Sequence, residues 1–313
     1  MKQTSFLLLS AFIVGGCSQT TPPAPPPSAQ SQTKAAQTLV DAMTGDAPAS
    51  RDNARALRRQ SDALLATKNY TGAMDKRLQM LALRSNDSST LGALTYYAIQ
   101  SLALGDIEKI ASHLDAASCG NSATRLEKID AQIPTYTLLL QREKASELKR
   151  LTQLSGDSQK WNRTIAGLGR TPQEQQTLNN MSVAQIAANI STVYDAAIER
   201  ATQPYSMQEI KVSTDPYTRT FATPSRIGRF LWTKFKTERV LLISALAARD
   251  ERRENRTLSL PMLSDPFGNG PLKEKKGVVY SVGPDTKDNG GKSVPSPNRV
   301  QPSDKGDLLA PTF

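Results

Sequence analysis

The chain has 313 residues and a formal net charge of +10, with 39 Lys and Arg, 29 Asp and Glu, one His and two Cys. This length is enough for one large domain or two small ones. A single histidine excludes a His-based zinc site, and two cysteines exclude a disulfide framework. The basic residues are scattered, without a compact arginine-rich motif and interleaved aromatic residues, so we do not expect nucleic acid as a partner.

The first sixteen residues have the organisation of a bacterial secretory signal peptide. Lys2 gives a basic start, and an apolar run over residues 6–14 is followed by two glycines. The run is too short to span a bilayer, which takes about 20 apolar residues. Residues 14–17, Val-Gly-Gly-Cys, also resemble the lipobox of bacterial lipoproteins, in which cleavage falls before the cysteine and the cysteine is lipidated. We therefore predict that Cys17 is the lipidated mature N-terminus and the membrane anchor. An ordinary signal peptide with an incidental cysteine is the alternative.

The segment over residues 17–35 predicts a disordered tether. Five of the six residues 22–27 are prolines, which favours an extended polyproline II spacer. The tract that follows, through Lys34, is rich in Ser, Gln and Thr and has little to bury. We expect this segment to hold the folded part off the membrane; a ligand for a proline-recognition module is the other interpretation. Ser18 after the cysteine, by resemblance to known lipoproteins, favours the periplasmic face of an outer membrane if the host has two membranes.

Residues 36–224 predict a helical body, which is followed by one more long helix over about 225–254. Apolar residues recur three and four positions apart, as at Met74, Leu78 and Leu81, and this is the period of a buried helix face. Turn-forming residues or a proline separate the expected helices at residues 67–70, 86–89, 104–106 and 134. A repeat of about 34 residues does not recur. We therefore predict a mainly α fold, an irregular antiparallel helical bundle or stack of hairpins with a small C-terminal β-hairpin module.

Start signals mark two of the later helices. Thr171, with Pro172 and Glu174 after it, has the pattern of an N-cap and first turn, and Ser182 can cap the helix that begins after it. In the middle of the chain we predict a helix over residues 107–117, a loop over 118–121 and a long helix over 123–154. Cys119 lies in that loop, and we expect an inert thiol.

The composition changes after the last long helix, where Gly, Pro and Asp become frequent. Residues 271–274 and 277–282 predict two short strands around a turn-rich loop. A two-stranded hairpin is marginal by itself in water, so we expect it to pack on the preceding helix, with 225–313 as one segment. Phe267 and Tyr280 are the expected buried aromatic residues. The last residues are expected to be disordered.

This tail resembles the end of the major pseudopilins (type II secretion protein G). The shared pieces are Asp-Pro-Phe-Gly-Asn at residues 265–269, Tyr-Ser-Val-Gly-Pro-Asp at residues 280–285, and Asp-Leu at residues 307–308. The chain is more similar still to a group of exported bacterial proteins of unassigned function, which join a helical body to such an ending. The resemblance implies a small sheet packed on a long helix. The N-terminal methylated transmembrane helix of pseudopilins is absent from this sequence, so we do not expect the chain to enter a pseudopilus in the usual way.

The resemblance also implies a calcium-binding loop. Calcium takes six to eight oxygen ligands. Carried over by position, Asp285 and Asp307 would supply carboxylates and Val282 a backbone carbonyl, with Asp288 as a further candidate. Asn289 stands where the similar group usually has a second Asp. The alternative is that these Asp and Gly residues build turns. Calcium is therefore the one cofactor that we consider, and otherwise we expect none.

Catalytic patterns are sparse in this sequence. His113, the single histidine, lies on an expected helix, and neither a nucleophile elbow nor a phosphate-binding Gly-rich loop is present. We expect Trp232 to anchor the core. We predict a non-enzymatic scaffold or interaction protein, anchored to a membrane by lipid, near a secretion or pilus-like assembly and with an envelope protein as partner. Two alternatives stay open: an enzyme that acts on an envelope polymer through carboxylates not singled out here, and a small-ligand-binding protein.

Overall fold

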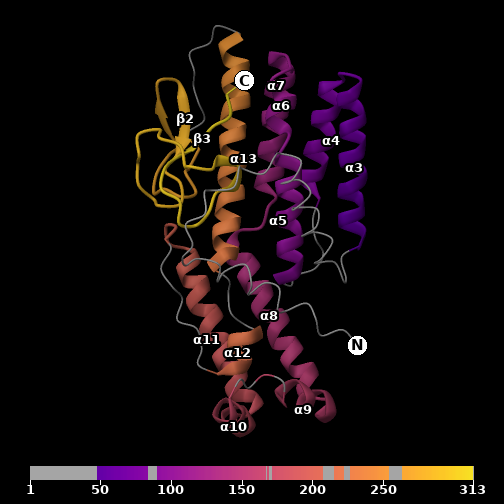
Figure 1. The fold of residues 1–313 in the computed structure, drawn as a ribbon, viewed down its shortest axis with the longest axis vertical. Helices are drawn as coiled ribbons and strands as arrows, with labels where there is room; N and C mark the ends of the chain where they lie inside the picture. The colour runs from indigo at the N-terminus through magenta and orange to yellow at the C-terminus, as the bar shows by residue number, and fades with distance from the viewer. Residues whose placement is uncertain are drawn as a thin grey trace, which may run out of the picture. The chain divides into compact units, whose positions relative to one another are not determined.

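The computed structural model describes residues 48–83, 90–166, 168, 171–206, 215–221, 226–253 and 263–312. Within these ranges the chain is mainly α-helical with a small three-stranded antiparallel sheet near the C-terminus, which confirms the predicted fold class (Figure 1). The predicted signal peptide, Cys17, the tether and the turn at residues 86–89 lie outside the described residues.

The helices follow the turn signals of the sequence closely. Lys68, with φ of +59°, lies in the turn between the first two described helices, and Gly105 and Pro134 lie in later breaks. The described helices are α3 (Pro48–Ala66), α4 (Tyr70–Ala82), α5 (Thr90–Leu104), α6 (Ile107–Ala111), α7 (Ala116–Ala131), α8 (Tyr136–Ser155), α9 (Ser158–Ala166), α10 (Pro172–Asn180), α11 (Val183–Ala201), α12 (Pro216–Phe221) and α13 (Arg226–Arg253).

The two predicted helix starts are confirmed. Thr171 is the N-cap of α10, and its hydroxyl accepts a hydrogen bond from the Glu174 backbone N–H at 3.2 Å. Ser182 is the N-cap of α11 and forms a full capping box with Gln185, with bonds of 3.2 and 2.7 Å. Each cap satisfies backbone donors that the first helical turn leaves unpaired.

The prediction for the middle of the chain is wrong in two places. The helix expected over 107–117 ends at Ala111, and Asp115 caps a new helix by accepting a hydrogen bond from the Ser118 N–H at 2.7 Å. The expected loop at 118–121 is therefore helical, and Cys119 is buried in α7. The long helix expected over 123–154 is divided at Pro134, the position where the proline predicted a kink or boundary, and Thr135 caps α8.

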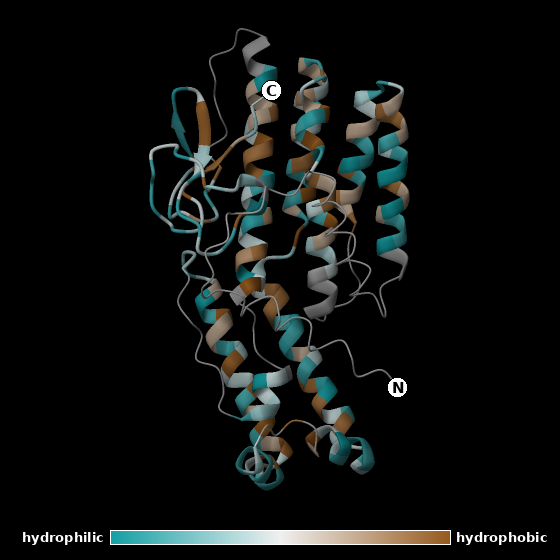
Figure 2. Ribbon diagram, viewed as in Figure 1, coloured by the Kyte–Doolittle hydropathy of each residue, from teal (hydrophilic) through white to brown (hydrophobic). Residues whose placement is uncertain are grey.

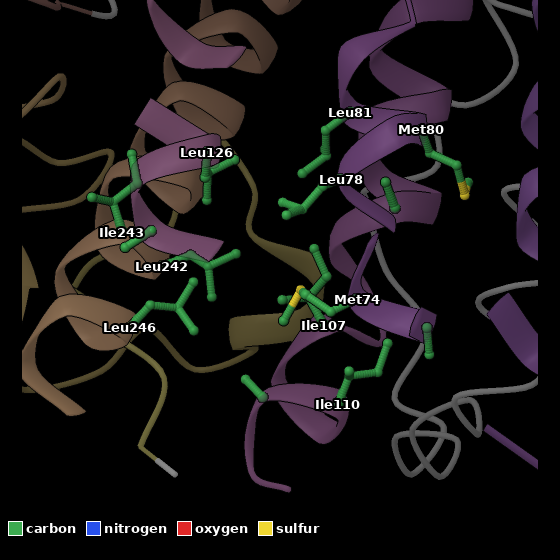
Figure 3. Packing of buried hydrophobic residues seen from close by; sticks show 14 of the residues in the cluster. Met74, Leu78, Met80, Leu81, Ile107, Ile110, Leu126, Leu242, Ile243 and Leu246 are labelled. Atoms are coloured by element: carbon green, nitrogen blue, oxygen red, sulfur yellow. The ribbon is translucent and has the colours of Figure 1, made fainter. Parts of the chain in front are cut away.

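Helix α13 is central to the packing. Its side chains between Thr233 and Ala248 are buried or half-buried on all sides of the helix, as expected for a helix without a polar stripe. On one side it contacts α5 and α7, and on the other it contacts strand β2 of the tail (Figure 1). Figure 3 shows Leu242, Ile243 and Leu246 of α13 in an apolar cluster with side chains of α4, α6 and α7, to which α3 and α5 also contribute.

A second apolar cluster lies among α8, α9, α10, α11 and α12. Helices α8 and α11 pack along each other, and the Lys144 ammonium lies 2.7 Å from the Asp195 carboxylate across them. The buried members of the cluster are Leu140, Leu151, Ile165, Leu178, Ile186, Ile190, Tyr194, Ala197 and Tyr217. The indole N–H of Trp232 on α13 donates to the Pro134 carbonyl at 3.1 Å, which links α13 to the start of α8.

Candidate functional site in the C-terminal tail

The tail contains a small antiparallel sheet with strand order β1-β2-β3. Its strands are β1 (Lys273–Lys275), β2 (Val278–Ser281) and β3 (Leu308–Leu309). Lys276 and Gly277, at φ of +53° and +76°, make the turn between β1 and β2. Strand β3 was not predicted. It pairs with β2, and the Ala310 N–H donates to the Val279 carbonyl at 2.8 Å. The tail is therefore held to β2 as far as Ala310, and the expected disorder of the last residues stays a prediction.

The sheet packs on α13, as predicted. Phe267 is 1% exposed and Tyr280 is 4% exposed, so both expected aromatic residues are buried. The Phe267 ring meets the Tyr205 ring edge-to-face, with centroids 4.7 Å apart, and it shares an apolar cluster with Phe230 and Leu241 of α13. Burial against α13 gives the short strands the partner that an isolated hairpin lacks.

Asp265, which the sequence analysis did not select, holds the beginning of the tail to the end of β2. One carboxylate oxygen, Oδ1, accepts hydrogen bonds from the Phe267 N–H at 3.0 Å and the Ser281 hydroxyl at 2.6 Å. The other oxygen accepts from the Val282 N–H at 2.8 Å. A Cβ added to Gly268 would lie 2.9 Å from this carboxylate, so the close approach requires glycine. The Asp-Pro-Phe-Gly motif is thus a structural clamp.

Asp307 organises the long loop after β2. Its side chain is fully buried, and its two carboxylate oxygens accept hydrogen bonds from the backbone N–H groups of Asn289 and Gly291, at 3.1 and 2.6 Å. Its own backbone N–H donates to the Lys292 carbonyl at 2.8 Å, and its carbonyl accepts from the Val294 N–H at 3.1 Å. One residue therefore binds the loop stretch over residues 289–294 through four hydrogen bonds.

Asp285 and Asp288 also lie in this loop but have different partners. Asp285 accepts from the Lys287 N–H at 3.1 Å and from the side-chain amide of Asn289 at 3.2 Å. Asp288 accepts from the Gly290 N–H at 2.9 Å and the Tyr280 hydroxyl at 3.1 Å, and its second oxygen lies 3.2 Å from the Lys273 ammonium. The hydrogen bond from Gly290, followed by the one from Lys273, lowers the pKa of Asp288.

These residues lie in one loop cluster, but they do not form an oxygen cage. Asn289 donates its side-chain amide to Asp285 and its backbone N–H to Asp307. Asp288 instead forms an ion pair with Lys273. Among the described residues, no three acidic, His or Cys side chains gather where they could hold a metal ion. N–H groups and an ammonium already bind the carboxylate oxygens that calcium would need, so this arrangement does not fit a calcium site. The contacts support the turn-building alternative, and melting of the wild type with calcium and with chelator decides between the two interpretations.

Sequence reasoning also missed two buried arginines that join helices. The Arg77 side chain is fully buried on α4, with Nη2 at 2.9 Å from an Asp62 oxygen and 3.2 Å from an Asp106 oxygen. Burial lowers the pKa of Arg77, and the carboxylates of Asp106 and Asp62 oppose the shift. Arg239 of α13 donates to Asp130 of α7 at 2.9 Å and to Gln100 of α5 at 3.2 Å. An arginine on an otherwise apolar helix face was the available signal in both cases.

Comparison of this chain with protein-family models, with curated proteins and with solved structures finds no match. The resemblance of the tail to pseudopilins therefore stays a prediction. None of the helices in the described part of the chain is long and apolar enough to cross a membrane.

Proposed function

We propose that this chain is a lipid-anchored protein of the bacterial cell envelope that acts as a non-enzymatic scaffold or interaction protein. The observation that carries the proposal is the lipobox-like sequence at residues 14–17, followed directly by the proline-rich segment over residues 22–27. The first feature provides an acylated cysteine at Cys17, and the second provides a spacer between the membrane and a folded body. If the host has two membranes, Ser18 favours the periplasmic face of the outer one.

The use of buried polar groups supports a structural body. Catalytic groups in clefts commonly have perturbed pKa values and face a substrate. In the described part of the chain, the buried carboxylates of Asp215, Asp265 and Asp307 each accept backbone N–H groups. The buried guanidinium groups of Arg77 and Arg239 each join helices to one another. These groups hold elements together, which is consistent with a function on the surface of the molecule.

The partner that we propose is an envelope protein near a secretion or pilus-like assembly. This part of the proposal rests on the resemblance of residues 265–269, 280–285 and 307–308 to the end of the major pseudopilins. The clamp at Asp265 and the packing of Phe267 give the tail a defined surface next to α13, which a partner could recognise.

Chemical cross-linking in the native host, followed by purification of the chain from detergent-solubilised envelopes, tests the proposal. We expect a specific envelope protein to co-purify with the wild type and to be depleted when Cys17→Ala releases the chain from the membrane. Equal recovery with both forms would show that the anchor does not place the chain beside its partner. Recovery of the chain alone, or turnover of an envelope polymer by the purified chain, would contradict the scaffold function.

A further inference from the structure

The sequence contains two Asn-Gly pairs, Asn269-Gly270 and Asn289-Gly290, and both lie in the C-terminal tail. The backbone nitrogen of the residue after an asparagine can attack the amide carbon of that asparagine side chain. Glycine favours this reaction because no side chain shields its nitrogen. Both pairs belong to loops, and Figure 2 shows the loops of the tail as mostly hydrophilic. Asn269 and Asn289 are both exposed, so exposure does not distinguish the two pairs. Their hydrogen bonds do.

A carboxylate holds the nitrogen of Gly290. The Gly290 N–H donates to Asp288 Oδ1 at 2.9 Å, and this hydrogen bond lowers the pKa of Asp288, which is therefore ionised at neutral pH. Attack requires the nitrogen to lose its proton, and the adjacent negative charge disfavours the anion that forms. The leaving group is held as well, because the Asn289 side-chain amide donates to the Lys287 carbonyl at 2.9 Å and to the Asp285 carboxylate at 3.2 Å. These contacts protect the pair.

The pair Asn269-Gly270 has no such protection. The Asp265 N–H donates to the Gly270 carbonyl at 2.8 Å and closes the loop over residues 265–270 at its base. Within the part of the chain that the structure describes, neither the Gly270 N–H nor the Asn269 side chain takes part in a hydrogen bond. Both residues are exposed, and a Cβ added to Gly270 would meet no atom within 4 Å. The nitrogen and the amide that react are therefore unrestrained and open to water.

We propose that Asn269 is a modification site at which the folded chain deamidates spontaneously, whereas Asn289 is protected. Solvent base removes the Gly270 N–H proton, the nitrogen bonds to Cγ of Asn269, and the Cγ–Nδ2 bond breaks as ammonia leaves with a proton from water. The product is a cyclic succinimide. Water then adds to one of its two carbonyls. Opening at Cγ gives aspartate, and opening at the backbone carbonyl gives isoaspartate, in which the main chain runs through the side chain. Water is the single co-reactant, and the proposal is independent of the lipid anchor.

Either product changes the surface of the tail. Both add a negative charge at an exposed position of the loop that Asp265 closes. Isoaspartate also lengthens the backbone of this loop, which carries Phe267 into the apolar cluster with α13. The surface that we propose for partner recognition therefore changes its charge as the protein ages.

Peptide mass spectrometry of the purified chain, incubated at mildly alkaline pH, follows both asparagines in one sample. In the folded chain we expect Asn289 to convert about 10- to 100-fold more slowly than Asn269, the factor that a hydrogen bond to a charged group gives. In urea the hydrogen bond to Asp288 is lost, so both pairs should convert at similar rates. Equal rates in the folded chain, or conversion of Asn269 in urea alone, would overturn the proposal.

Two variants of one carboxylate contact test the cause of the protection. Asp288→Ala removes the acceptor of the Gly290 N–H, so conversion of Asn289 should accelerate by about 10- to 100-fold. Lys273→Gln is the matched control. It removes the ammonium that lies 3.2 Å from the other Asp288 oxygen and leaves the Gly290 hydrogen bond in place, so Asn289 should stay slow. Equal acceleration in both variants, or none in Asp288→Ala, would contradict protection by this hydrogen bond.

Gly270→Ala tests the attacking nitrogen without disturbing the fold. Gly270 lies outside the left-handed region and has room for a Cβ, so the melting temperature should be unchanged. The new methyl group shields the nitrogen, so Asn269 should stay intact over a period in which the wild type converts. Conversion at the wild-type rate would contradict attack by the Gly270 nitrogen. Hydrogen exchange at the Val282 amide, which Asp265 binds, should be unchanged in this variant and shows that the tail remains folded.

Discussion

Replacement of Asp265 by alanine should detach the beginning of the tail from β2. The Asp265 carboxylate is buried and accepts three hydrogen bonds, from Phe267, Ser281 and Val282. A hydrogen bond to a charged group contributes about 1.5–3 kcal/mol, and a buried donor left without an acceptor carries a desolvation penalty of similar size. The three bonds share one carboxylate and are not additive, so we expect a loss of about 3–5 kcal/mol in the free energy of unfolding.

Urea denaturation followed by circular dichroism measures this loss, and hydrogen exchange at the Val282 amide locates it. Asp304→Ala is the matched control, because this half-buried carboxylate of the same tail accepts one turn hydrogen bond, from the Gln301 N–H at 2.7 Å. Removal of this hydrogen bond by Asp304→Ala should lower the free energy of unfolding by about 1 kcal/mol or less. Asp265→Asn should lower the free energy of unfolding by about 2 kcal/mol. The asparagine NH₂ group would face one of the donors that now bind the carboxylate, and two donors cannot form a hydrogen bond with each other. The clamp interpretation fails if Asp265→Ala costs no more than Asp304→Ala.

Three further predictions concern other parts of the chain. The wild-type melting temperature should be the same with calcium and with chelator, whereas Asn289→Asp adds a carboxylate to the loop and should make melting calcium-dependent; a calcium shift in the wild type would contradict the hydrogen-bonded loop. Gly120→Ala should change the free energy of unfolding by about 1 kcal/mol or less in urea titrations, because the new Cβ displaces the end of the Asp250 side chain while alanine is about 1 kcal/mol more favourable than glycine inside a helix; in an Asp250→Ala background the same change should be stabilising, and a loss there would contradict this cause. Burial raises the pKa of Tyr136 and Tyr194 above the ordinary value of 10.0, so their contribution to stability is complete below about pH 10 and falls above it as the unfolded chain ionises. Tyr136→Phe should therefore reduce the loss of urea resistance between neutral and alkaline pH, and an unchanged loss would refute this cause.

The sequence predicts the features that depend on neighbouring residues. Thr171 and Ser182 cap helices because their hydroxyls reach N–H groups three residues away, and such local patterns survive in the folded chain. The burial of Phe267 and Tyr280 follows from the need of a short hairpin for a partner. The apolar length of α13 indicated a helix, although its position between the bundle and the sheet was visible only in the structure.

Features that depend on distant residues could not be predicted in the same way. Asp265 meets Ser281 and Val282, sixteen and seventeen residues later, and nothing near Asp265 in the sequence indicates that contact. Strand β3 is two residues long and exists because Leu309 pairs with Tyr280. The break before α7 was missed because no glycine or proline marks it, and an aspartate cap at residue 115 alone defines the start. The proposed site residues were selected by resemblance, and their hydrogen bonds became visible only in the folded loop.

The most direct test of a lipid anchor at Cys17 is metabolic labelling of the host with a fatty-acid probe, followed by separation of membrane and soluble fractions. The wild type should carry the probe and fractionate with the membranes, and Cys17→Ala should be unlabelled. Mass spectrometry of the mature N-terminal peptide should place the acyl groups on Cys17. Equal labelling of both forms, or a mature N-terminus at any other residue, would contradict the lipid anchor at Cys17, on which the proposed scaffold function rests.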